Sequence, residues 1–203
     1  MRDLKRHLII TLSLAVILLS GVVYAGECVV TDISLSPSKS GGLINILNKI
    51  WNDGACEVQN HDMKVRYSEY IKHDGPFHVV RFNKSMDIYA DSIPAIKGNN
   101  GKPVVIVADP GKSVKILGGM EGKSSSFIIR GGGGRVVLDN ISIEGFPGTG
   151  VQVDSDNNLL INVKVKDSGL GENSGYGIHL LGKGNYVVDS EIIGSGLDGI
   201  VVG

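Results

Sequence analysis

The sequence is poor in the side chains that fill the core of a large globular enzyme. Its 203 residues include one Trp and four Phe, whereas Gly occurs 29 times. Few aromatic residues and many glycines favour short strands joined by turns. Excess positive charge is also missing, since 20 Lys and Arg stand against 21 Asp and Glu. Nucleic-acid binding draws on clustered positive charge, so no nucleic-acid partner is expected.

The first 25 residues have the pattern of a secretory signal peptide. Three basic residues precede an apolar run over residues 8–23, and small residues at Val23 and Ala25 mark a cleavage site after Ala25. The run is shorter than the roughly 20 residues that span a bilayer comfortably, and a retained membrane anchor is the alternative. We expect residues 1–25 to be removed, leaving no membrane span. The product is then secreted and extracellular, periplasmic or attached to the cell surface.

Cysteine and histidine are too few and too scattered to form a zinc site. No two of them share the C-x-x-C or i, i+4 spacing of metal ligands. The two cysteines, Cys28 and Cys56, follow the predicted cleavage site. In an oxidising compartment they can pair across a loop of about 29 residues, which contributes on the order of 3 kcal/mol. Two unrelated buried thiols are the alternative.

An apolar triplet recurs along the C-terminal half of the chain. The triplets begin at Phe127, Val151, Ile178 and Ile200, and the last three follow a glycine. Separations of 24, 27 and 22 residues between these positions are typical of the coils of a solenoid. Alternation within a strand directs the first and third residues of each triplet inward and leaves Gln152 and His179 outside.

A second repeat is marked by a polar residue between two apolar runs. Asn140, Asn162 and Ser190 are aligned at this position in three successive coils. A short amide side chain tolerates a left-handed turn and can hydrogen-bond to the neighbouring coil. Each coil therefore has three short strands: the triplet, one strand before this column and one after it. No coil can bury its own apolar face, so the coils must stack at roughly 4.8 Å.

These features resemble the right-handed parallel β-helix of the pectate-lyase-like superfamily. The resemblance rests on the run Gly-Ile-His-Leu, the Asn column and the coil spacing, and it covers residues 77–203. It implies an all-β fold, a right-handed parallel β-helix with three short strands per coil. Apolar residues at a 3.6-residue period predict an amphipathic helix over residues 41–52. In proteins of this kind such a helix caps the first coil, so residues 26–76 form an N-terminal capping region.

The last triplet restarts the coil pattern at the end of the sequence. We therefore expect residues 77–203 to be the N-terminal portion of a longer β-helix, truncated at the C-terminus. Solenoids need a terminal cap to shield the last apolar layer. An uncovered layer is expected to associate end to end with another copy.

The resemblance places a saccharide on the outer surface of the sheet that the triplets form. In lyases of this superfamily, carboxylates there bind calcium and an Arg acts as the base. Asp154 and Asp156 are the candidate Ca²⁺ ligands, because two carboxylates with nearby amides form an oxygen-rich cluster. An ion pair between Asp154 and Arg130 on the preceding coil is the alternative. Arg130 is the candidate catalytic base or substrate clamp, unless it lies at a sheet edge beside a turn.

Further candidates for glycan binding lie on the same face and in the longest loop between coils. Gln152, Asp154 and His179 project from the triplets, whereas Asp167, Glu172 and Asn173 belong to the loop KDSGLGENSGYG. Long loops on one face of a solenoid often carry recognition.

Two classes of function follow from these residues. The sequence favours a secreted or surface protein without a complete catalytic site, adhesin-like or polysaccharide-binding, whose partner is an extracellular polysaccharide or cell-surface glycan. The alternative is the N-terminal fragment of a polysaccharide lyase or glycoside hydrolase that acts on acidic polysaccharide. Such an enzyme needs acids or a base that converge from adjacent coils. On the two coils after Asp154, the aligned positions are Leu181 and Gly203, which supply no acid. Calcium is the one cofactor that these residues suggest.

Overall fold

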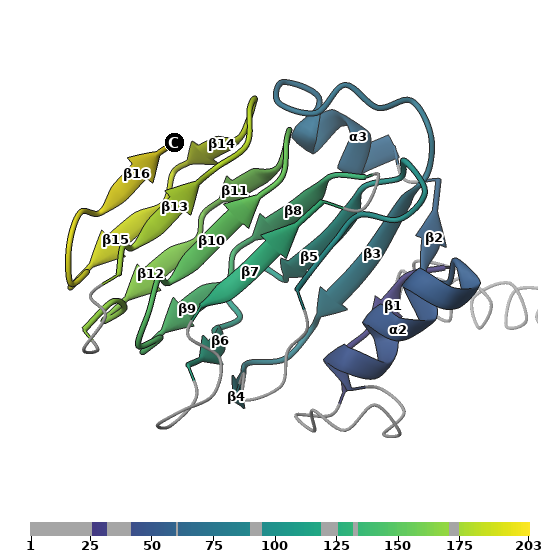
Figure 1. Cartoon of the computed structure of the whole chain (residues 1–203). Helices are drawn as coiled ribbons and strands as arrows, with labels where there is room; N and C mark the ends of the chain where they lie inside the picture. Colours follow the sequence, from purple (N-terminus) through teal and green to yellow (C-terminus); the bar gives the residue numbers. More distant parts are fainter. Residues whose placement is uncertain are drawn as a thin grey trace, which may run out of the picture.

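The computed structural model describes the chain in seven segments: residues 26–31, 42–59, 61–89, 95–118, 126–131, 134–170 and 175–203. The predicted signal peptide and the loop residues Glu172 and Asn173 lie outside them. Figure 1 shows short strands stacked side by side, with α2 next to β1 at one end and the C-terminus beside β16 at the other. In the part of the chain described, no helix is long and apolar enough to cross a membrane.

The strands form three sheets that the chain visits in a fixed order. The seven-stranded sheet contains β1 (Cys28–Val29), β2 (Glu57–Val58), β3 (Phe77–Phe82), β5 (Val104–Ala108), β8 (Val136–Asp139), β11 (Leu159–Ile161) and β14 (Tyr186–Val188). The five-stranded sheet contains β4 (Met86–Tyr89), β6 (Val114–Leu117), β9 (Ser142–Glu144), β12 (Lys164–Lys166) and β15 (Glu191–Ile193). The four-stranded sheet contains β7 (Phe127–Arg130), β10 (Val151–Asp154), β13 (Ile178–Leu180) and β16 (Ile200–Val202). From β5 onward, each pass enters the seven-stranded, then the five-stranded, then the four-stranded sheet.

Successive passes stack strand on strand in parallel, except that β2 pairs antiparallel with β3. In the four-stranded sheet, Phe127, Val151, Ile178 and Ile200 are successive register partners. The register predicted from the recurring triplets is therefore confirmed. Val151 and Ile178 are fully buried, whereas the middle residue Gln152 is partly exposed, as the period of two requires.

One apolar core runs along the inside of the stack and continues under a helix. Each sheet contributes fully buried side chains to it, including Ile106, Ile143 and Val153. The helix predicted over residues 41–52 is present as α2 (Leu43–Asp53), which ends at Gly54 in the left-handed conformation. Four of its apolar side chains join the same core: Leu43, Ile46, Leu47 and Ile50. The Asn99 side-chain amide donates to the Ile50 carbonyl at 2.6 Å, which ties this helix to the stack.

A second core covers the outer face of the seven-stranded sheet, which the sequence analysis did not predict. It forms under α3 (His61–Tyr67) and the segment that follows it. Met63, Tyr67 and Ile71 pack there against outward side chains of β3, β5, β8 and β11. Because β3, β5 and β8 are buried on both faces, these strands read as continuous apolar runs rather than as alternating ones.

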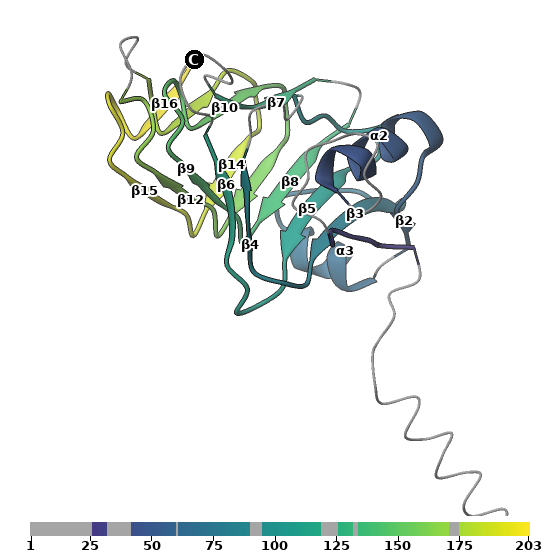
Figure 2. The same cartoon turned by 90° about the horizontal axis from the view of Figure 1, so that it is seen from below.

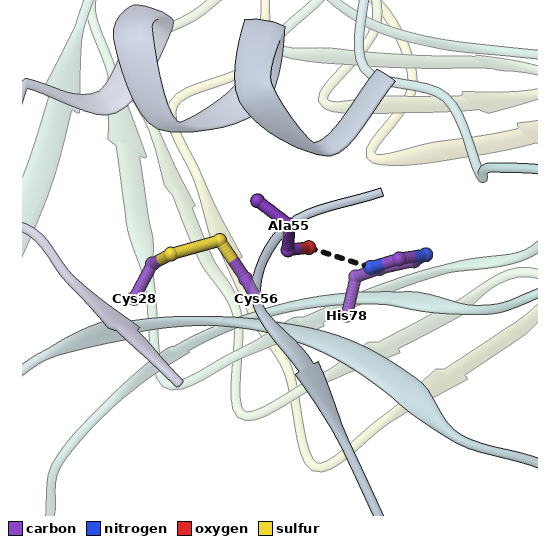
Figure 3. Close-up of a disulfide and its surroundings, with 4 residues drawn as sticks. All are labelled: Cys28, Ala55, Cys56 and His78. Carbon is purple, nitrogen blue, oxygen red and sulfur yellow. Dashed lines mark hydrogen bonds between the residues drawn. A yellow bond between two sulfur atoms is a disulfide. The ribbon is translucent and has the colours of Figure 1, made fainter. Parts of the chain in front are cut away.

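The edge of β3 at the start of the stack is covered by β1 and β2. Cys28 pairs with Val80 of β3, and Glu57 pairs with His78. Figure 3 shows the disulfide that joins Cys28 to Cys56, with the Nδ1 atom of His78 2.7 Å from the Ala55 carbonyl oxygen. The disulfide thus links β1 to the residue directly before β2, and these two short strands cover an otherwise open sheet edge.

One position of the predicted polar column is wrong. Strand register aligns Ile161 with Val188 and Lys164 with Glu191, which places Asp189, not Ser190, beside Asn162. Asp189 has φ 46°, close to the 51° of Asn162. The alignment slipped by one residue because Asp, like Asn, tolerates this left-handed conformation.

Candidate functional site

Among the described residues, the outer faces of the four-stranded and five-stranded sheets are open, whereas α3 and the segment after it cover β3, β5, β8 and β11 of the seven-stranded sheet. In Figure 2 the five-stranded sheet runs from β15 to β4 along one side of the stack. Outward residues of successive passes form columns at strand spacing, roughly 4.8 Å. A ligand that contacts either face therefore meets side chains from several passes at once.

The predicted site on the four-stranded sheet is occupied by interactions within the protein. Arg130 Nη2 lies 3.4 Å from Asp154 Oδ2, and Gln152 Nε2 donates to Asp154 Oδ1 at 2.7 Å. Arg130 and Asp154 are register partners on β7 and β10. The structure therefore contains the ion pair that was the alternative to calcium binding.

Asp156 lies apart from that pair, at the turn after β10. Its Oδ1 atom accepts a hydrogen bond from the backbone N–H of Lys183 at 2.8 Å, so it joins two passes. Calcium takes six to eight oxygen ligands, whereas in the described residues no group of three His, Cys, Asp or Glu converges on a metal position. Asp154 and Asp156 as placed do not fit a calcium site.

The remaining predicted residues are also separated. His179 packs its ring against Tyr176 with the centroids 5.1 Å apart. Asp167 has φ 49° and its backbone N–H bonds to the Ile193 carbonyl, so it forms the corner after β12. Its carboxylate lies 3.3 Å from Lys166 Nζ.

A groove on the five-stranded sheet was missed by the sequence analysis. Its volume is about 460 Å³, and β6, β9 and β12 form its floor. We call it the lysine groove, after the four cationic residues that line it: Lys112, Lys115, Lys164 and Lys166. Asn140, Ser142 and Glu144 also line it.

Strand register fixes where these lysines lie. Lys115 of β6 is next to Ser142 of β9, which is next to Lys164 of β12. Glu144 is the neighbour of Lys166 in the same way. Buried Ile116 and Val165 lie between the outward residues of their strands, so the alternation typical of strands puts the lysines outside.

Each of three lysines has an acidic neighbour at the surface. Lys115 Nζ is 3.7 Å from Glu144 Oε2, Lys164 Nζ is 2.9 Å from Glu191 Oε2, and Lys166 Nζ is 3.3 Å from Asp167 Oδ2. Glu144 also accepts a hydrogen bond from the Ser142 hydroxyl at 2.7 Å. In the pairs of Lys164 and Lys166 both side chains are exposed. Exposed ion pairs contribute about 0–1 kcal/mol, so an anionic ligand can displace these two acids at little cost.

Two charged residues of the seven-stranded sheet, Asp139 and Arg81, lie beside α3 instead. Asp139, fully buried, accepts hydrogen bonds from the Tyr67 hydroxyl at 2.7 Å and from Arg66 at 2.6 Å. Arg81 contacts Glu27 at 2.5 Å and Asp109 at 2.6 Å. Burial, followed by the Asp139 charge, raises the pKa of Tyr67.

Arg66 and Arg81 are both held in ion pairs by these carboxylates. The hydrogen bond to Glu27 raises the pKa of Arg81 above its usual value. A hollow of about 210 Å³ beside Arg66 and Arg81 therefore contains two guanidinium groups that already hold carboxylates. This cluster fastens α3 and β1 to the sheet and offers no open cation to a ligand.

Comparison with known proteins gives no match. No family model matches the chain, and neither a curated protein nor a solved structure is significantly similar to it. The assignment of a function therefore depends on the geometry of this chain.

Proposed function

We propose that the chain is a secreted, right-handed parallel β-helix, capped on its first coil by α2, that binds an extracellular polysaccharide in the lysine groove. Residues 26–76 form the capping region and residues 77–203 the coils. The fixed order of the three sheets and their parallel register support the helical path. The apolar side chains that α2 adds to the internal core support its role as a cap, because a first coil otherwise exposes its interior.

Secretion is supported by two independent features of the chain. The first 25 residues read as a signal peptide. The disulfide between Cys28 and Cys56 belongs to an oxidising compartment such as the cell exterior or the periplasm.

The observation that carries the binding proposal is the lysine groove itself. It is an open hollow of about 460 Å³ whose floor is made by three stacked passes. Solenoids bind extended ligands along such surfaces because equivalent side chains repeat from coil to coil. Lysine, serine and asparagine side chains supply donors and acceptors for saccharide hydroxyl groups.

The side chains on the outer face of the four-stranded sheet favour a binding function over lyase chemistry. Arg130, which the resemblance offers as a base, is held by Asp154. Leu181 continues the Asp154 column on the next pass and cannot supply an acid. The proposal is therefore one of recognition.

Native affinity electrophoresis with a panel of soluble neutral and acidic polysaccharides tests this proposal. We expect at least one polysaccharide to retard the protein, and Ser142→Trp, which fills the centre of the groove, to abolish the retardation. Gln152→Trp places the same bulk on the four-stranded sheet and serves as the matched control. Retardation by none of the panel, or a loss caused by Gln152→Trp and not by Ser142→Trp, contradicts the proposal.

A further inference from the structure

The lysine groove is rich in positive charge, although the chain as a whole has no excess of basic residues. The whole chain carries a formal net charge of −1, yet the residues that line the groove include four lysines and one acid, Glu144. A neutral polysaccharide needs no such excess. The Glu144 carboxylate contacts Ser142 and Lys115. Its negative charge is therefore partly balanced and repels an anion in the rest of the groove only weakly.

We infer that the ligand of the lysine groove is an anionic polysaccharide, whose carboxylate or sulfate groups pair with Lys115, Lys164 and Lys166. This inference rests on the proposed function and adds the chemical class of the ligand. Lysine suits it because its ammonium group is a compact charge with three donors on a flexible stem. A flexible ammonium group can reach the charged substituents of a polysaccharide even when their positions vary from one sugar unit to the next.

The spacing of the lysines fits a charge that repeats along an extended polymer. Lys115 and Lys164 lie two strands apart, with Ser142 between them, which separates their backbone positions by roughly 9.6 Å. Lys164 and Lys166 are two residues apart on β12, a separation of roughly 6.6 Å. Cations thus line the groove both across and along the strands, and Lys112 extends the array at the turn before β6.

The acids that neighbour the lysines act as competitors for the ligand. The Glu191 side chain is 61% exposed and lies 2.9 Å from Lys164. It lies on the adjacent strand, β15, so an incoming anion can take its place at Lys164 while Glu191 turns to water. Removal of the Glu191 charge should therefore strengthen binding, which a purely structural ion pair does not predict.

The groove favours a saccharide over a nucleic acid. Proteins that bind single strands combine a basic groove with aromatic side chains on which bases stack. Within the described part of the chain, no aromatic side chain lines this groove. Exposed Asn162 instead presents a side-chain amide, which can both donate to and accept from hydroxyl groups.

Binding of the full secreted chain to immobilised polygalacturonate, heparin, dextran and single-stranded DNA tests the inference, and the first two separate carboxylate from sulfate recognition. We expect polygalacturonate, heparin or both to bind, and dextran and DNA to bind at least tenfold more weakly. Lys115→Gln with Lys164→Gln should lower the affinity roughly fivefold to thirtyfold. Glu191→Gln should raise it about twofold to fivefold, a gain that misfolding cannot produce.

Lys64→Gln with Lys183→Gln removes the same charge outside the groove and is the matched control. An equal loss in this control overturns the inference, since the effect is then one of net charge. DNA bound as tightly through the same lysines also overturns it. If dextran binds as well as the acidic polymers and the lysine pair has no effect, polysaccharide binding stands and the inference fails. If no polysaccharide binds, the proposed function fails as well.

Discussion

The seven-stranded and five-stranded sheets belong to the same passes of the chain, yet their outer faces differ. On the seven-stranded sheet the outward residues of β5 and β8, such as Val107 and Val137, are buried under α3. On the five-stranded sheet the outward Lys115 and Lys164 are partly exposed. One face therefore contributes to stability, and the other is available to a ligand.

Ion pairs show the same contrast at nearly equal distances. Arg66 and Asp139 are 2.6 Å apart on the covered sheet, and Asp139 is 0% exposed. Lys164 and Glu191 are 2.9 Å apart on the open sheet, with side chains 43% and 61% exposed. Contact distance alone does not distinguish them. Burial decides, because a buried charge that loses its partner cannot be hydrated, whereas an exposed one can.

The largest effect is expected from Arg81→Met on the covered sheet. This change removes the guanidinium group that contacts the Glu27 carboxylate, which is 2% exposed. Breaking such a pair from one side costs about 3–5 kcal/mol. Chemical denaturation should show this loss in the free energy of unfolding.

Lys164→Met is the matched change on the open sheet, because it removes a cation of similar length from an ion pair. Surface substitutions of this kind stay within about 0.5 kcal/mol. If the two variants lose similar free energy of unfolding, the distinction between a covered and an open face is wrong.

A smaller effect, with a pH dependence, is expected from Tyr67→Phe. The lost hydrogen bond to the Asp139 carboxylate should cost about 1.5–3 kcal/mol at neutral pH. In the wild type the raised pKa of Tyr67 means that the folded state keeps a proton which the unfolded state releases above about pH 10. Stability from this group is therefore complete below that pH and is lost as pH rises, by up to about 1.4 kcal/mol per pH unit.

Urea titrations from pH 8 to 11 measure this dependence. The difference in free energy of unfolding between wild type and Tyr67→Phe should shrink as the pH rises through that range. A difference between wild type and Tyr67→Phe that stays constant over this range would mean that α3 does not bury the Tyr67 hydroxyl group.

The open faces and the internal register could be predicted from the sequence, because a strand with one buried face alternates with a period of two. Val151, Gln152 and Val153 show this pattern directly. The same alternation is present around Ile116 and Val165, and it could have identified the lysines as outward residues. The lysine groove was not predicted, because the resemblance places the saccharide on the sheet that the triplets form, whereas the groove lies on the five-stranded sheet.

The covered face could not be predicted in the same way. α3 contributes only a few apolar residues from seven positions, too few for a clear helical period. Its partner Asp139 lies 72 residues beyond Tyr67, and no local pattern reports such a contact. The available signal was the run Val104–Ala108, in which all five residues are buried, since continuous apolar strands indicate burial on both faces.

Small effects are expected at Asp189, at the corner where the seven-stranded sheet passes into the five-stranded one. Its φ of 46° suits Asn and Gly, so Asp189→Asn and Asp189→Gly should each change the free energy of unfolding by less than about 0.5 kcal/mol. Asp189→Ala should cost about 1–2 kcal/mol, because a Cβ without a polar group is disfavoured in this conformation. At Ser190, whose hydroxyl donates to the Val188 carbonyl at 2.8 Å, replacement by Gly should instead be unfavourable. Thermal melts of these four variants test the register. If Gly were tolerated at position 190 and not at 189, the register of the last pass would be wrong by one residue. Ile193, rather than Ile192, would then face the core.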